Sequence, residues 1–90
     1  MTKAEANKVK KLLKTIGNYK VYYNSQKEEL RVMVAECNLD RVTITTAMEL
    51  ANTNTIKILS LLTKSGLRPK YKKAEKLYQG YIKTHYIVFC

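Results

Sequence analysis

The sequence predicts a small α+β fold, because helix and strand patterns alternate along its 90 residues. Residues 2–17 carry an amphipathic helix pattern, and residues 81–89 are rich in the β-branched and aromatic side chains that strands favour. A chain of this length forms one domain, residues 1–90. Two arrangements fit these patterns, and they differ in whether residues 45–67 form one helix or two.

The N-terminal helix is predicted from its cap and its apolar stripe. Thr2 and Glu5 have the spacing of a capping box, in which each side chain bonds the other residue's backbone N–H. Four apolar residues then recur at helical spacing: Val9, Leu12, Leu13 and Ile16. Gly17 follows as a glycine suited to a positive φ at the helix end. We therefore expect a helix over residues 3–16, with its lysines facing solvent or phosphates.

The next segment contains a short strand and an ambiguous stretch. Residues 19–23, YKVYY, are β-formers and predict a strand. Residues 25–37 fit two structures, because Ser25 and Glu28 repeat the capping-box spacing while Leu30, Val32 and Val34 alternate as in a strand. The cap spacing favours the helix for this stretch, and the β-branched valines favour the strand.

The middle of the chain predicts two helices with a break between them. Ala47 and Ala51 belong to a helical stripe, although the β-branched run at 42–46 also fits a strand. Asn52-Thr53-Asn54-Thr55 would cost roughly 2–3 kcal/mol relative to alanine inside a helix, and the same residue types are preferred caps. We therefore expect a turn at 52–55 and a second helix that ends at Gly66.

The C-terminal third predicts strands. Pro69 stops the preceding helix, and residues 68–80 fit either a strand with a loop or a short helix over 70–78. Residues 81–89 carry apolar side chains on both faces, which predicts a central or well-covered strand.

The charge of the chain predicts a polyanionic partner. Seventeen basic and seven acidic residues give a net charge of +10, concentrated in residues 3–20 and 64–83. Such self-repulsion opposes compaction unless a polyanion binds, and nucleic acid is the expected one. No apolar run approaches the roughly 20 residues of a membrane span, and no secretory signal follows the basic N-terminus. We expect a cytoplasmic or nucleoid-associated protein that is neither secreted nor membrane-bound.

Residues 45–67, TTAMELANTNTIKILSLLTKSGL, resemble a winged helix-turn-helix, with a basic segment and a strand where that family places its wing. The resemblance implies a winged-helix-like fold with an added N-terminal amphipathic helix, and a transcription regulator or accessory factor that binds duplex DNA through its second helix. It places these residues on or near the reading helix: Thr53, Asn54, Thr55, Lys57, Ser60 and Lys64. In the wing it places Lys70, Lys72, Lys73 and Lys76, and the expected nucleic-acid contacts also include Arg68, Tyr71 and Tyr78. The segment departs from that pattern in its short turn and in having no arginine on the reading helix.

The alternative arrangement keeps one helix over 47–65 and packs two helices on an antiparallel sheet of three or four strands. Its strands would be 19–24, 29–36, 81–89 and, as an option, 41–46. In this arrangement the tyrosines of the C-terminal third interleave with lysines, a composition typical of single-strand or RNA binding, in which rings stack on bases and lysines hold the backbone.

Other kinds of site receive little support from the sequence. His85 is alone, and Cys37 and Cys90 lack metal spacing, so we expect no enzyme activity, cofactor or metal. We expect reduced thiols, and a Cys37–Cys90 bridge stays open. The abundance of lysine, asparagine, isoleucine and tyrosine, all with AT-rich codons, suggests a virus, phage or plasmid. A second hypothesis is therefore an accessory protein that binds an acidic host protein; a homodimer is compatible with either function.

Overall fold

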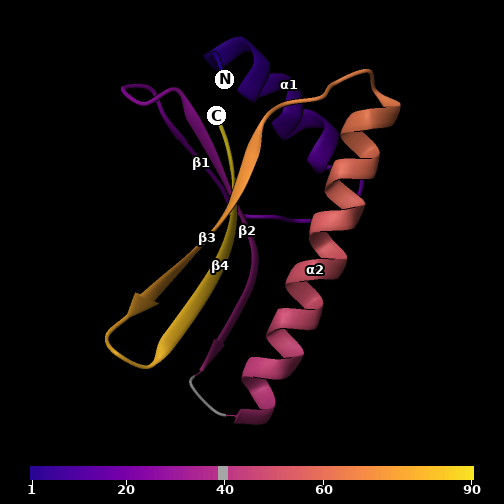
Figure 1. The fold of residues 1–90 in the computed structure, drawn as a ribbon. Helices are drawn as coiled ribbons and strands as arrows, with labels where there is room; N and C mark the ends of the chain where they lie inside the picture. The colour runs from indigo at the N-terminus through magenta and orange to yellow at the C-terminus, as the bar shows by residue number, and fades with distance from the viewer. Residues whose placement is uncertain (39–40) are drawn as a thin grey trace.

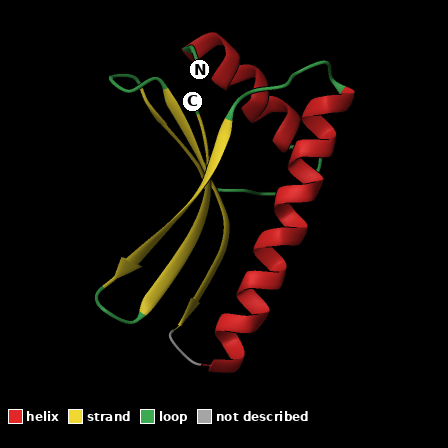
Figure 2. Cartoon of the chain, viewed as in Figure 1, coloured by secondary structure: helices red, strands yellow, loops and turns green. Residues whose placement is uncertain are grey.

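The computed structural model describes residues 1–38 and 41–90, without the side chains of residues 41–44 and 78. Its elements are, in chain order, α1 (Lys3–Leu13), β1 (Val21–Asn24), β2 (Glu29–Asn38), α2 (Arg41–Lys64), β3 (Tyr71–Tyr78) and β4 (Ile82–Phe89). The four strands form one antiparallel sheet in the order β1-β2-β4-β3. The long α2 runs beside the sheet, and α1 packs against α2 and β1 (Figures 1 and 2). The fold is α+β and has the alternative arrangement, a sheet packed against two helices.

The capping box that begins α1 is confirmed. The Thr2 hydroxyl accepts a hydrogen bond from the Glu5 N–H at 3.3 Å, and the Thr2 N–H donates to Glu5 Oε1 at 3.2 Å. The helix buries Ala6, Val9 and Leu13 and ends at Leu13, three residues earlier than expected. A turn leads on to Gly17, which does not have the expected positive φ.

Residues 29–38 form a strand, as the alternative arrangement expected for 29–36, and not the helix that the capping-box spacing at Ser25 and Glu28 favoured. The Asn24 side-chain oxygen accepts hydrogen bonds from the backbone N–H groups of Gln26 and Lys27, at 3.0 and 3.2 Å. These bonds fold residues 25–28 into the turn of a hairpin, and β2 then pairs with β1 on one side and β4 on the other. The ladders with β1 and β4 give the β2 backbone its hydrogen-bond partners, and the valines of β2 suit a strand.

The expected turn at residues 52–55 is wrong, because α2 is continuous through them. The Asn54 amide donates to the Val34 carbonyl oxygen at 2.6 Å and accepts from the Tyr19 hydroxyl at 3.1 Å. The Thr55 hydroxyl donates to the Ala51 carbonyl oxygen at 2.7 Å inside the helix. These bonds, together with burial of one face, override the low helix propensity of the segment. The optional strand at 41–46 is also helical.

The helix α2 ends at Lys64, and the predicted helix-ending glycine, Gly66, follows with a φ of +79°. The Leu67 N–H donates to the Leu62 carbonyl oxygen at 2.8 Å, and the Gly66 N–H donates to the Thr63 carbonyl oxygen at 3.0 Å. This pair of bonds is the Schellman motif, which requires a residue that accepts positive φ. Over the described residues, neither helix is long and apolar enough to cross a membrane.

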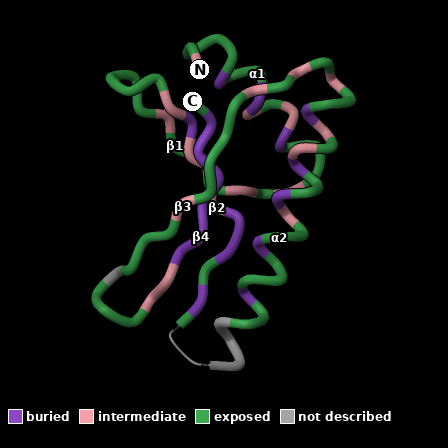
Figure 3. The backbone as a smooth tube through the Cα atoms, viewed as in Figure 1, coloured by how far each residue is buried: buried purple, intermediate pink, exposed green. Residues whose placement is uncertain are grey.

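The core lies between the sheet and the two helices (Figure 3). Its fully buried side chains from both layers include Leu13, Leu30, Val32, Ile58, Leu62, Ile87 and Phe89. The strand β4 is central and buried along most of its length, as its apolar pattern predicted. Cys37 and Cys90 are both free: Cys37 lies near one end of β2, while Cys90 follows Phe89, which pairs with Leu30 at the other end.

Candidate nucleic-acid interface

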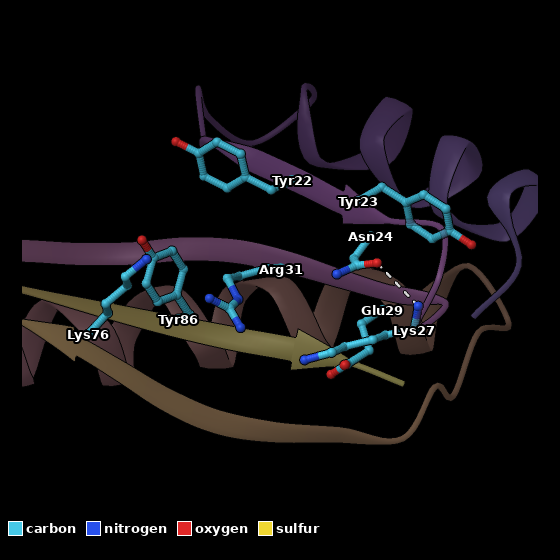
Figure 4. A pocket seen from close by; sticks show the side chains of 8 residues that line it. All are labelled: Tyr22, Tyr23, Asn24, Lys27, Glu29, Arg31, Lys76 and Tyr86. Carbon is cyan, nitrogen blue, oxygen red and sulfur yellow. Dashed lines mark hydrogen bonds between the residues drawn. The ribbon is translucent and has the colours of Figure 1, made fainter.

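The sheet has a second face that the helices do not cover. Side chains alternate across a strand, so the residues of β2 that flank Leu30 and Val32 point away from the core. Cross-strand pairing places Tyr22 of β1 beside Arg31 of β2, and both point away from the helices. Figure 4 looks onto this face, with the helices behind the strands. We call it the open face.

Arg31 and Tyr86 form a stacked pair at the centre of the open face. The guanidinium carbon of Arg31 lies 5.1 Å from the centroid of the Tyr86 ring. Tyr86 is 4% exposed, so it is not itself a surface for a ligand, whereas Arg31 is partly exposed above it. The pair therefore presents a planar cation to solvent, held in place by the aromatic ring beneath it.

A hollow of about 320 Å³ surrounds this pair (Figure 4). Its lining residues come from the β1–β2 hairpin and from β3 and β4: Tyr22, Tyr23, Asn24, Lys27, Glu29, Arg31, Lys76 and Tyr86. Asn24, Lys27 and Glu29 lie at one end, Tyr86 and Lys76 lie at the other, and Arg31 lies between them. The hollow thus joins an aromatic and basic end to an end with amide and carboxylate groups.

The open face is predominantly positive. Its basic residues are Lys20, Lys27, Arg31, Lys72 and Lys76, and its acidic residues are Glu29 and Glu36. Lys72 Nζ lies 3.8 Å from Glu29 Oε2 across the sheet, and the Glu29 side chain is only 22% exposed. This weak pair leaves a surplus of positive charge for an anionic ligand.

Of the twelve predicted site residues whose side chains the structure describes, Lys72 and Lys76 lie on the open face of the sheet. On β3, Tyr71 and Lys73 pair with Phe89 and Ile87 and therefore point to the other side of the sheet. The Tyr71 and Phe89 ring centroids lie 6.4 Å apart, so Tyr71 contacts Phe89 on that side while 45% of Tyr71 stays exposed. The Tyr78 side chain is outside the described part of the structure.

Of the predicted reading-helix residues, Thr55 lines a hollow on the helix side of the sheet together with Lys73 of β3. The Asn54 and Thr55 side chains hydrogen-bond within the protein, and Thr55 is buried. Four others are exposed on α2, in the helix layer: Thr53, Lys57, Ser60 and Lys64. Arg68 and Lys70 lie in the connection between α2 and β3. The six lysines of residues 3–20 also lie on different parts of the protein: four lie on α1, and Lys20 lies on the open face.

The sequence reasoning missed Tyr22, Lys27 and Arg31. The sequence does contain a signal for Arg31, because Arg31 and Met33 alternate with the apolar Leu30 and Val32 as in a strand with one buried face. Because helix and strand were both open for this stretch, the sequence alone did not show that Arg31 points away from the core.

A small cluster of ionisable side chains lies on the helix side of the sheet. His85 is buried, and its Nδ1 lies 3.6 Å from Glu75 Oε1, while Lys83 Nζ lies 3.0 Å from Glu75 Oε2. Among the described residues no three histidine, cysteine or acidic side chains gather as metal ligands would.

Comparison with known proteins adds no relative: no family model, no curated protein and no solved structure matches the chain significantly. The features that point to a function are therefore those of the open face.

Proposed function

We propose that the protein binds single-stranded nucleic acid on the open face of its sheet. The observation that carries this proposal is the Arg31–Tyr86 pair in a basic hollow, with the half-exposed ring of Tyr22 beside it. Aromatic rings and guanidinium planes stack on unpaired bases, and lysines hold the backbone.

Four open-face residues contact the nucleic acid in two ways, by stacking on bases and by binding phosphates. The Tyr22 ring and the outer face of the Arg31 guanidinium stack on bases, a contact worth roughly 1–3 kcal/mol per base for aromatic rings. Lys72 and Lys76 lie on the same face of β3. They bind phosphates and hold the nucleic-acid backbone along the sheet. Affinity comes from both contributions, and the phosphate part weakens as salt rises.

A single strand fits this surface better than the duplex that the helix-turn-helix resemblance implied. The duplex hypothesis needed a separate reading helix, and residues 52–55 instead lie inside α2 with Asn54 and Thr55 bonded within the fold. A concave site between strands admits an unpaired base that is turned out of a stack. Duplex DNA becomes the comparison ligand.

Fluorescence anisotropy of labelled oligonucleotides tests the proposal. The probes are octauridylate, octathymidylate and a 16-base-pair duplex, each titrated at several salt concentrations. If the four lysines of the open face contact phosphates, log K for the single strands falls against log salt with a slope of about −2.8. The duplex should bind more weakly than either single strand.

Matched double variants locate the binding surface. Lys72→Gln/Lys76→Gln removes two charges from the open face, and Lys8→Gln/Lys11→Gln removes two exposed charges from α1. The first variant should lower single-strand affinity about tenfold and reduce the salt slope by about 1.4, while the second changes both much less. Equal losses in the two variants, tighter duplex binding, or no single-strand binding at ~50 mM salt would overturn the proposal.

A further inference from the structure

We propose that the hairpin end of the hollow reads a guanine base, with Asn24 and Glu29 as the specificity-determining residues. This inference rests on the proposed function and adds a base preference to it. It arises from a carboxylate and an amide that lie side by side in a surface otherwise suited to phosphate.

Asn24 supplies one hydrogen-bond donor. Its side-chain oxygen is held by the backbone N–H groups of Gln26 and Lys27, which orients the amide group. The amide nitrogen then points along the hollow toward Arg31 (Figure 4). A ligand that enters the hollow therefore meets the amide as a donor.

Glu29 supplies the neighbouring acceptor. It is the direct cross-strand partner of Asn24, so the two side chains leave the same face of the sheet about 5 Å apart. The Glu29 side chain is 22% exposed, and its Oε2 lies 3.8 Å from Lys72 Nζ, a long contact that leaves lone pairs for other donors. A carboxylate repels phosphate, so its place in this hollow fits a partner that donates hydrogen bonds.

Guanine matches this pair best among the four bases. Its Watson–Crick edge carries two adjacent donors, N1–H and the 2-amino group, which a carboxylate accepts together, and the O6 acceptor beside them, which the Asn24 amide can reach. Adenine and cytosine offer one donor beside an acceptor, and uracil offers a single N–H. Arg31 lies two residues from Glu29 on the same face of β2, about 7 Å along the strand, where its guanidinium can stack on the purine ring.

The test compares labelled octauridylate with the same octamer carrying one central guanosine, inosine or adenosine. Inosine keeps O6 and N1–H but lacks the 2-amino group. The wild-type protein should bind the guanosine octamer about tenfold more tightly than octauridylate, the size expected of one bidentate base contact, with inosine intermediate.

Glu29→Gln should reduce the guanosine preference to less than about twofold, because the bidentate acceptor is lost. Asn24→Asp, which keeps the oxygen that the turn needs, should also reduce it. Glu36→Gln is the matched control, since Glu36 is exposed on the same strand outside this hollow. Circular dichroism verifies that each variant is folded.

The outcomes separate this inference from the proposed function. Equal binding of all octamers by the wild-type protein, or a guanosine preference that survives Glu29→Gln, overturns the guanine site and leaves single-strand binding in place. Failure to bind any octamer overturns the proposed function, and the guanine site with it. A preference lost in Glu29→Gln and kept in Glu36→Gln supports both.

Discussion

The guanidinium carbon of Arg31 lies 5.1 Å from the centroid of the Tyr86 ring, and this contact joins β2 to β4 on the face opposite the helices. The Tyr86 ring is almost entirely covered, so the Arg31 guanidinium is the part of this pair that is exposed to solvent. An arginine held in this way has fewer conformations to lose when a flat ligand stacks on it.

Replacing Arg31 by lysine should separate stacking from charge. Lysine keeps the positive charge but has no planar group, so we expect about a fivefold loss of octauridylate affinity with little change in the salt slope. Arg68→Lys, in the connection before β3, is the control. Anisotropy titrations measure both quantities, and unchanged affinity in Arg31→Lys would show that Arg31 acts only as a charge.

Asn54 should be a stability residue. Asn54→Ala removes the donor to the Val34 carbonyl oxygen and the acceptor of the Tyr19 hydroxyl, which should cost about 1–3 kcal/mol of unfolding free energy. Asn52→Ala is the control, because Asn52 is an exposed residue of the same helix. Urea denaturation gives both values. A loss no larger than that of Asn52→Ala would mean that the two hydrogen bonds contribute nothing.

Thr53→Ala tests the continuity of α2 directly. Thr53 is exposed inside the helix, where alanine has the higher helix propensity, so the variant should be more stable by roughly 0.5 kcal/mol. A threonine that capped a second helix would instead lose stability on the same change. Thermal unfolding distinguishes the two signs.

The capping box should give α1 a pH-dependent stability. Hydrogen bonds from the Thr2 backbone N–H and hydroxyl hold the pKa of Glu5 below its ordinary value of 4.5. Because the folded-state pKa is the lower one, the stabilisation is present above pH 4.5 and is lost as the pH falls through the folded-state value. The Tm difference between the wild type and Glu5→Gln should therefore shrink below pH 4.5.

The Thr2→Ala background supplies the check on that pH effect. Without the hydroxyl, Glu5 loses one of its two hydrogen bonds, so Glu5→Gln should lower Tm by less than in the wild type. An equal effect in both backgrounds would mean that the Thr2 hydroxyl does not couple to Glu5.

Local signals predicted the parts of the fold that depend on neighbouring residues. The Thr2–Glu5 box and the Gly66 helix end involve contacts within a few residues, and both are confirmed. The strand over 29–38 and the unbroken α2 depend on partners elsewhere in the chain. The sequence around Asn54 indicates a turn until Tyr19 and Val34, 35 and 20 residues away, supply its hydrogen bonds.

The candidate site was harder to predict for the same reason. Lys72 and Lys76 stand out in a basic segment, but the side chains that share the open face with them come from β1, β2 and β4. Arg31 joins Tyr86, 55 positions later, only once β2 pairs with β4. Sheet order therefore determines which residues meet, and composition alone does not reveal it.

Amide chemical-shift mapping during titration with octauridylate tests most directly where a nucleic acid binds. We predict that the largest ¹H–¹⁵N shifts fall on the strands around Tyr22, Arg31 and Tyr86, and that the outer side of α2 moves little. Shifts concentrated at Lys57, Ser60 and Lys64, with the strands unchanged, would contradict binding on the open face and return the interface to the helix.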